Sequence, residues 1–394
     1  MKVVLSTIGK FHTFDLARQL ERRGALSAIF TGYPRFKLRN EGLPATSIRP
    51  FPWLHAPYMA VPMRRWFGAA FTREWEYRDK QSLDAYVAAR LPECDVFSGL
   101  SGSALRSGKK AQSRGARYVC DRGSAHIAFQ DDILREEYQR WGVPFAGIDP
   151  RVIAREEEEY AQADLITVPS TFVLESFVAK GVARDKLRLA PYGVDLSRFS
   201  PVAEPERGVF DVLFVGSVAV QKGVLDLLDA FARLQHPNKR LTLVGSVTEE
   251  MRRLLAEKRL LNERVRLAGH VPQPSLKRIM SASHVMVLPS LQEGLAMVQA
   301  QAMACACPVI GTANTGAADL FDDGAEGFIV PIRDPAAIAA KLQRLADEPA
   351  LRDDMGRAAL LRVRRLGGWD SYGERMQAIF AEVSHPGVAG ARPL

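Results

Sequence analysis

The amino-acid sequence predicts an α/β protein in which two Rossmann-like domains face each other across a cleft. Short apolar runs alternate with segments of helical periodicity along the chain, which is the pattern of parallel sheets covered by helices on both faces. The alternation is interrupted at residues 201–208, whose prolines, glycine and charged residues are typical of an interdomain linker. At 394 residues, the chain also exceeds what one hydrophobic core usually organises.

The amino-terminal part is predicted to begin with a strand and a helix. Residues 2–6 form a short buried run, and residues 14–23 form a helix whose Leu16 and Leu20 share one face. Gly24 then ends this helix. The strands of this first sheet are expected at residues 2–6, 27–30, 95–98, 117–120, 164–168 and 187–190.

A second alternating series follows the linker. Its strands are expected at residues 211–215, 240–244, 265–267, 284–288, 308–311 and 327–330. Its helices are expected at residues 224–234, 249–258, 275–283, 295–304, 317–321 and 336–348. We therefore predict one domain over residues 1–200, a second over residues 208–368 and a terminal helix over residues 369–384, and we expect the tail after Ser384 to fray.

The composition excludes several classes of protein. With 47% apolar and 25% charged residues, the chain is neither a disordered nor a collagen-like protein nor a disulfide scaffold. It has no run of eighteen apolar residues, and its start becomes polar too early for a signal peptide. The four cysteines lack the spacing of a zinc site or a redox pair. We therefore expect a reduced, cytoplasmic protein.

The positive charge is concentrated near the amino terminus. The first 80 residues hold 14 Lys and Arg against 6 Asp and Glu, so this part accounts for the whole net charge of +8. Two interpretations stay open: an anionic membrane surface bound by basic and aromatic side chains, or a solvated basic edge with the aromatic rings packed inward. No nucleic-acid-binding motif accompanies the charge, so we expect no nucleic-acid partner. The mixed stretch contains Arg35, Lys37, Arg39, Arg49, Arg64 and Arg65 together with Phe51, Trp53, Tyr58, Trp66, Phe67 and Trp75.

The turn after the strand at 211–215 carries the first candidate site. It begins with Gly216 and Ser217 and ends with Lys222 and Gly223 at the mouth of a helix. A lysine beside backbone amides that glycine leaves free is suited to hold a phosphate or a diphosphate. The alternative is a surface lysine before a helix.

Two further turns are predicted to lie on the same rim, because ligands of such sheets bind beyond the carboxyl ends of the strands. The carboxylate of Glu293, in a turn with Gly294, can accept hydrogen bonds from sugar hydroxyls, and Gln301 lies two helical turns further on. The turn around Gly316 would offer an anion nest of exposed amides. The alternatives are a helix cap for Glu293 and a surface amide for Gln301.

Together these turns resemble those of a known family, the retaining nucleotide-sugar glycosyltransferases of the GT-B fold, specifically the large family 4 group. The resemblance is strongest over residues 187–382. Its marks are Pro191-Tyr192-Gly193-Val194-Asp195 with Phe199, Gly216 with Lys222-Gly223, Glu293-Gly294, Pro308-Val309-Ile310, and Gly324 with Gly327.

The resemblance implies roles for individual residues. Lys222 would bind the donor diphosphate, and Glu293, with Gly294 and Leu295 beside it, would open a Glu-x7-Glu motif that contacts the donor sugar. It also implies a donor-side first turn at Gly9, an active-site histidine at His126, binding without a metal or other cofactor, and a final helix that crosses back to the first domain.

Two positions depart from the pattern of the family. Ser217 stands where the family commonly has an arginine, and Gln301 stands where the motif ends in a second glutamate. A glutamine can still form hydrogen bonds with ribose hydroxyls, whereas the loss of the arginine removes a cation from the diphosphate site. Arg122 is our candidate for a replacement cation or an acceptor contact.

The predicted function is therefore retaining transfer of a sugar from a nucleoside-diphosphate sugar to a hydroxyl acceptor. The donor would bind the second domain and the acceptor the first. The basic aromatic stretch suggests a glycan or lipid-linked acceptor, as in surface polysaccharide or exopolysaccharide assembly, and peripheral attachment to the inner face of the membrane. The alternatives are an enzyme that makes a soluble glycoside or disaccharide and a non-catalytic nucleotide-sugar-binding homologue. An NAD-dependent oxidoreductase is disfavoured, because no Gly-x-Gly-x-x-Gly opens a helix after either first strand.

Overall fold

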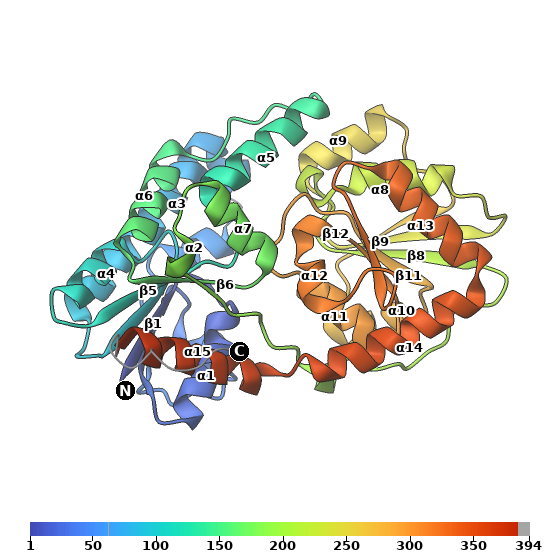
Figure 1. The fold of residues 1–394 in the computed structure, drawn as a ribbon. Helices are drawn as coiled ribbons and strands as arrows, with labels where there is room; N and C mark the ends of the chain where they lie inside the picture. The colour runs from blue at the N-terminus through green and yellow to red at the C-terminus, as the bar shows by residue number, and fades with distance from the viewer. Residues whose placement is uncertain (62, 385–394) are drawn as a thin grey trace.

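The computed structural model describes residues 1–61 and 63–384, with the side chains of residues 63–65 and 196 left out. The predicted fraying after Ser384 and the side chains of Arg64 and Arg65 therefore lie outside the described residues. Two fully parallel sheets, of seven and six strands, form two α/β halves that sit side by side (Figure 1). The predicted fold class is confirmed.

The seven-stranded sheet belongs to the amino-terminal half and has the order β3-β2-β1-β4-β5-β6-β7. Its central strands are buried on both faces along almost their whole length, as expected for a sheet covered by helices on both sides. The strands are β1 (Val3–Thr7), β2 (Leu26–Thr31), β3 (Ile48–Pro50), β4 (Val96–Leu100), β5 (Arg117–Asp121), β6 (Leu165–Val168) and β7 (Leu187–Leu189). The helices are α1 (His12–Arg22), α2 (His55–Ala60), α3 (Met63–Arg90), α4 (Leu105–Gln112), α5 (Ile127–Arg140), α6 (Pro150–Gln162) and α7 (Thr171–Ala179).

The six-stranded sheet follows the linker and has the order β10-β9-β8-β11-β12-β13. Its strands are β8 (Phe210–Val215), β9 (Lys239–Val244), β10 (Val265–Gly269), β11 (Val285–Leu288), β12 (Val309–Thr312) and β13 (Gly327–Val330). Its helices are α8 (Val224–Arg233), α9 (Glu249–Glu257), α10 (Gln273–Ser281), α11 (Met297–Ala304), α12 (Ala317–Leu320), α13 (Pro335–Asp347) and α14 (Pro349–Arg365).

The chain ends with α15 (Trp369–Ser384), which returns from the second half to the first and lies beside α1 (Figure 1). Its Tyr372, Met376 and Phe380 are buried in one apolar cluster with Leu5 and Phe14. These residues of α15 lie on one side of the helix, and burial of such large side chains holds α15 against the first sheet. The predicted crossover helix is confirmed.

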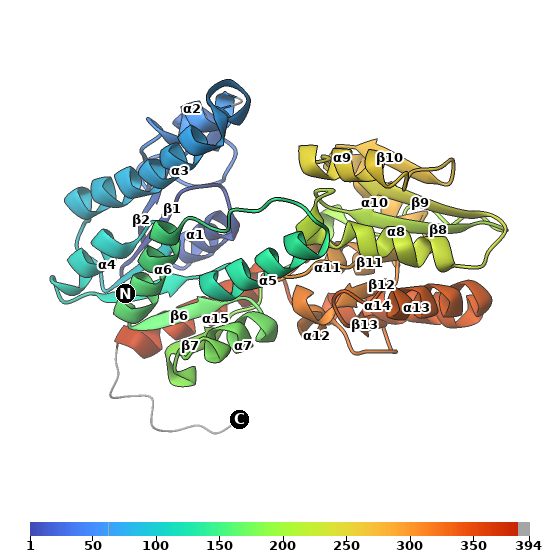
Figure 2. The ribbon, with the colours of Figure 1, turned by 90° about the horizontal axis from the view of Figure 1, so that it is seen from above.

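The carboxyl ends of strands from both sheets meet at the interface between the halves. Loops after β1, β4 and β5 come from one half, and loops after β8, β11 and β12 come from the other. Figure 2 shows α5 reaching from the first half toward the second, whereas α2 and the start of α3 stand at an outer corner. The fold therefore brings turns that are far apart in the sequence to one cleft.

Candidate active site in the interdomain cleft

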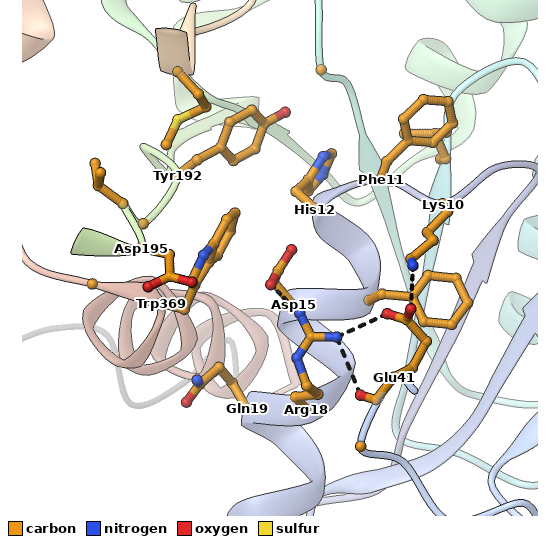
Figure 3. A pocket seen from close by; sticks show the side chains of 18 of the residues that line it. Lys10, Phe11, His12, Asp15, Arg18, Gln19, Glu41, Tyr192, Asp195 and Trp369 are labelled. Carbon is orange, nitrogen blue, oxygen red and sulfur yellow. Dashed lines mark hydrogen bonds and ion pairs between the residues drawn. The ribbon is translucent and has the colours of Figure 1, made fainter. Parts of the chain in front are cut away.

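A cavity of about 1320 Å³ lies between the two halves (Figure 3). Its walls are the turn between β1 and α1, the turn after β5, the connection at residues 192–199, α11 and the start of α15. A second cavity of about 1220 Å³ continues toward α3 and shares four lining residues with the first. These shared residues are Lys80, Arg122, Ser124 and Glu156.

The halves touch directly where the turns after β5 and β6 meet the turn after β11. The Ser124 hydroxyl donates to Gln292 Oε1 at 2.9 Å, and the Ser170 hydroxyl donates to the carbonyl of Gly294 at 2.5 Å. Gly294 also packs so close to Gly123 that any Cβ at Gly294 would overlap the carbonyl oxygen of Gly123. A glycine is therefore required at position 294 for the two rims to close together.

Lys222 and Glu293, predicted from separate turns to bind the donor, form an ion pair with each other. Their side chains are 21% and 19% exposed, so ligand atoms can reach both groups. Lys222 ends a short helical turn, and Gly223 follows with φ +64° in close contact with the carbonyl of Pro289. A larger residue than glycine would disturb that contact and displace Lys222. The structure thus places a cation and a carboxylate at one point of the rim.

The turn around Gly316 holds the turn of Glu293 in place. The amide of Glu293 donates to the carbonyl of Asn314 at 2.8 Å, and Asn314 Nδ2 donates to the carbonyl of Leu291 at 2.9 Å. Gly316 is buried beside Leu295. The carbonyl and the side-chain amide of Asn314 thus fix the turn that carries Glu293.

Of the remaining donor-side predictions, only Gln301 lines one of the two cavities. Gln301 lines the larger cavity from α11. Ser217 is half-buried in the loop after β8, where the preceding Gly216 donates its amide to the carbonyl of Val244 at 2.9 Å. Gly9 is itself buried in the turn between β1 and α1, whereas its two neighbours in the sequence line the cavity.

Arg122 lines both cavities, but its guanidinium has no donor left for a ligand. Its five N–H groups are directed at the carbonyl of Ala125 twice, at Ser101 Oγ, at Gln130 Oε1 and at Glu156 Oε2, the last at 2.5 Å. Burial opposes its charge and is the largest single effect, but the Glu156 carboxylate together with Tyr160, Cys120 and Glu159 raises the pKa of Arg122 overall. The geometry does not support the predicted role as a replacement cation, and Arg122 instead fixes the turn after β5.

His126 lies in the core and lines neither of the two cavities described above. Its imidazole is 3% exposed and packs against Tyr160 and Phe177, and its Nδ1 accepts a hydrogen bond from the amide of Ala128 at the start of α5. Burial, and then the charges of Arg122 and Lys180, lower the pKa of His126 to about 4. A histidine in this position caps a helix, so we leave His126 out of the proposed catalytic set.

The structure adds a histidine that the sequence analysis did not single out. His12, the first residue of α1, lines the larger cavity, and its Nε2 lies 2.6 Å from Oδ2 of Asp121 at the end of β5. The imidazole stacks on Tyr192 with 4.3 Å between the ring centroids (Figure 3). His12 and Asp121 are 109 residues apart, so no local motif could have shown that they meet.

Comparison with known proteins agrees with this architecture. Residues 199–362 match the family described as glycosyl transferases group 1. The chain is 31% identical over 284 residues to D-inositol 3-phosphate glycosyltransferase of Pseudarthrobacter chlorophenolicus and 30% identical over 314 residues to that of Thermomonospora curvata. The matches cover 63% and 65% of this chain and span 66% and 73% of the two relatives.

A solved structure supports the fold over nearly the whole chain. Sucrose-phosphate synthase from Thermosynechococcus elongatus superposes with a TM-score of 0.72 at 23% identity, covering 97% of this chain and 99% of that one. Two facing parallel sheets with polar turns at the cleft, together with these likenesses, define a glycosyltransferase of the GT-B fold. Within that class, the chain belongs to the group 1 glycosyl transferases.

Proposed function

We propose that the protein transfers a sugar from a nucleoside-diphosphate sugar to a hydroxyl acceptor with retention of configuration at the anomeric carbon. The observation that carries this proposal is the Lys222–Glu293 pair, which lies beside the point where the two halves touch. A cation for the diphosphate and a carboxylate for the sugar are the two groups that such a donor needs at its reacting end.

In this proposal each group has a separate task. When the donor binds, Lys222 exchanges its ion pair with Glu293 for one with the diphosphate. Its charge then stabilises the negative charge that grows on the leaving group in the transition state. Glu293 is then free to accept hydrogen bonds from the sugar hydroxyls. Gln301, on the wall of the larger cavity, takes ribose hydroxyls as a neutral group. The acceptor approaches from the first domain on the face that the diphosphate leaves, so no covalent sugar–enzyme intermediate forms.

Calorimetry with UDP, GDP, ADP and their common sugar conjugates in EDTA tests the donor site. We expect one nucleotide to bind in preference to the others without a metal ion. Donor hydrolysis followed by ¹H NMR then tests retention. The first sugar anomer detected should have the same configuration as the donor. Binding of no nucleotide, or release of the inverted anomer, would contradict the proposal. Binding without turnover on any acceptor would favour a non-catalytic homologue.

The acceptor is proposed to be a lipid-linked glycan at the cytoplasmic face of a membrane. No helix among the described residues is long and apolar enough to span a bilayer. Large apolar side chains are nonetheless exposed in the predicted basic aromatic stretch, notably Trp53 at 74%, Trp66 at 64% and Phe67 at 54%. Aromatic rings beside basic groups suit the interface of an anionic bilayer. Four of those basic side chains are exposed, namely Arg35, Lys37, Arg39 and Arg49.

The double variant Trp66→Ser/Phe67→Ser tests this membrane surface. We expect its partitioning onto phosphatidylglycerol-containing vesicles to fall roughly tenfold in a sedimentation assay, because two aromatic rings no longer leave water. Leu361→Ser, in α14 of the second half, removes another exposed apolar side chain and should leave partitioning unchanged. Unchanged sedimentation of the double variant would favour a solvated edge and an acceptor that yields a soluble glycoside.

A further inference from the structure

The second cavity, of about 1220 Å³, continues from the cleft along the first domain. Lys80, Arg122, Ser124 and Glu156 line both cavities and therefore mark the junction between them. From this junction, the second cavity follows one face of α3 from Lys80 back to Ala69. This stretch of helix rises by roughly 16 Å, and the volume exceeds the upper end of about 1,000 Å³ that is usual for small-molecule pockets. The second cavity therefore has room for a ligand longer than one sugar ring.

Three side chains in its wall keep hydrogen-bond donors free for a ligand. The Tyr77 hydroxyl and the Lys80 ammonium make no hydrogen bond or ion pair to any residue that the structure describes. Gln130 accepts from Arg122 through Oε1 at 3.0 Å, and its Nε2 has no partner among the same described residues. The Glu156 carboxylate at the junction is already bound to Arg122. The free groups are thus donors, which suit the oxygens of a hydroxyl-rich ligand.

Aromatic rings form another part of the same wall. Tyr138 and Phe145 stack with 4.6 Å between their ring centroids, and the Arg151 guanidinium lies 4.3 Å from the ring centroid of Tyr77. Aromatic side chains with a few polar groups among them are the usual lining of a ligand site. The C–H face of a sugar ring can pack on such rings while its hydroxyls reach the donors. The chemistry of the second cavity therefore matches a glycan.

One helix, α5, connects this cavity with the proposed donor site. Gln130 and Tyr138 of α5 line the cavity. The same helix contacts the turn at Val220–Lys222 and packs against Leu291 in the turn after β11. A ligand in the second cavity thus lies against a helix that also supports both donor turns.

Buried ion pairs hold the carboxyl end of α5 on the second domain. Arg140 donates to both carboxylate oxygens of Asp226, at 3.0 and 2.7 Å. Arg333 Nε donates to Glu137 Oε2 at 2.7 Å. Both carboxylates are shielded from water, and breaking such a pair leaves a buried charge without a partner. The cavity wall and the donor turns therefore keep fixed relative positions.

The outer end of the second cavity lies on the helix that carries exposed aromatic side chains. Ala69 and Thr72 of α3 line the cavity. Trp66, Phe67 and Phe71, close to them on the same helix, are exposed. Figure 2 shows this part of α3 at an outer corner of the first half. A glycan attached to a lipid at that corner can reach the cleft through the second cavity.

We propose that the second cavity binds the inner sugar units of an extended glycan acceptor, whose outermost sugar lies in the cleft and receives the transferred sugar. The inference rests on the proposed function and deepens it, because it names an acceptor of two or more sugar units. Tyr77, Lys80 and Gln130 donate to the hydroxyls of the inner units. Binding energy from these units, which do not react, holds the attacking hydroxyl against the donor.

The test measures transfer of radiolabelled sugar from the donor found by calorimetry. The acceptors are the lipid extract and the water-soluble glycans of the cells that produce the protein, and the fraction that becomes labelled distinguishes a lipid-linked from a soluble glycan. Mass spectrometry of the labelled product should find at least two sugar units besides the added one. Ala146→Trp, which fills the second cavity, should lower the ratio of transfer to donor hydrolysis about tenfold or more. Ala179→Trp, at the exposed end of α7 in the same domain, should keep the wild-type ratio.

The outcomes separate this inference from the proposed function. A wild-type protein that binds no nucleotide in calorimetry overturns both. Transfer to a lipid or a sugar without a second sugar unit overturns the inference alone, and so does a folded Ala146→Trp variant with the wild-type ratio. Nucleotide binding with no transfer to either fraction overturns the inference and favours a non-catalytic homologue.

A second variant decides if thermal unfolding shows that Ala146→Trp does not fold. The double variant Tyr77→Phe/Lys80→Gln removes the Tyr77 hydroxyl and the Lys80 charge and leaves the cavity open. An apparent KM for the labelled fraction about tenfold above that of the wild type supports the inference, because hydrogen bonds to the inner sugars are lost. A wild-type KM in this variant overturns it.

Discussion

Replacing Lys222 with alanine is expected to lower kcat about 100- to 1000-fold and to weaken nucleotide binding by about 1.5–3 kcal/mol. The ion pair with Glu293 shows where the Lys222 ammonium lies. Its charge should matter most when negative charge grows on the leaving diphosphate. The loss of kcat should therefore exceed the loss of affinity. Steady-state kinetics with the donor found by calorimetry, together with calorimetry on the variant, measures both quantities.

Two companion variants of this pair distinguish charge from shape. Lys222→Arg keeps a cation and should retain much of the nucleotide affinity, with a smaller loss of kcat because the group is larger. Glu293→Ala should lower kcat while leaving the affinity for the free nucleotide diphosphate nearly unchanged, since its expected partner is the sugar. If Lys222→Ala had the same kcat and nucleotide affinity as the wild type, the assignment of the donor site would be wrong.

Replacing Arg122 with leucine is expected to destabilise the first domain by about 3–5 kcal/mol, because Glu156 then remains as a buried, unpaired carboxylate. The side chains of both residues are only 9% and 3% exposed, so the Glu156 carboxylate is poorly solvated once its partner is removed. Urea denaturation followed by tryptophan fluorescence measures the effect. The double variant Arg122→Leu/Glu156→Leu removes both charges and should recover much of the stability.

This experiment also decides between the two roles considered for Arg122. If Arg122 were the replacement cation of the diphosphate site, Arg122→Leu would lose nucleotide affinity while keeping its stability. We expect the opposite result: Arg122→Leu should lose stability, and its folded fraction should keep the nucleotide affinity of the wild type. Preserved stability with weakened nucleotide binding would contradict the structural role that its five hydrogen bonds indicate.

The sheets could be predicted from the sequence because each central strand is a short, continuous apolar run. The twelve predicted strands are all present, most of them within one residue of their expected ends. The missing strand was β3 (Ile48–Pro50), which has three residues, one of them proline, and lies at the edge of its sheet. An edge strand of this kind has neither the length nor the apolar pattern that marks a strand in a sequence.

The site was predictable only where its chemistry is local. Lys222 and Glu293 each follow a strand within a turn of their own, so residue type and position were enough to single them out. The position of Arg122 was predicted, but its partners Ser101 and Glu156 come from other elements, and they convert a free cation into a buried structural one. The pairing of His12 with Asp121 depends on the order of strands in the sheet, where β4 separates β1 from β5.

The return of α15 to the first sheet has a consequence for biosynthesis. Tyr372, Met376 and Phe380 complete the apolar cluster around Leu5 and Phe14, so the core of the first domain contains residues from both ends of the chain. While the ribosome is still translating the second domain, that cluster stays uncovered. The second domain, whose strands and helices are contiguous in the chain, can finish folding before the first. We therefore expect the first domain to complete its folding only after the second domain has been translated, and a chain that ends before residue 369 to remain bound to chaperones.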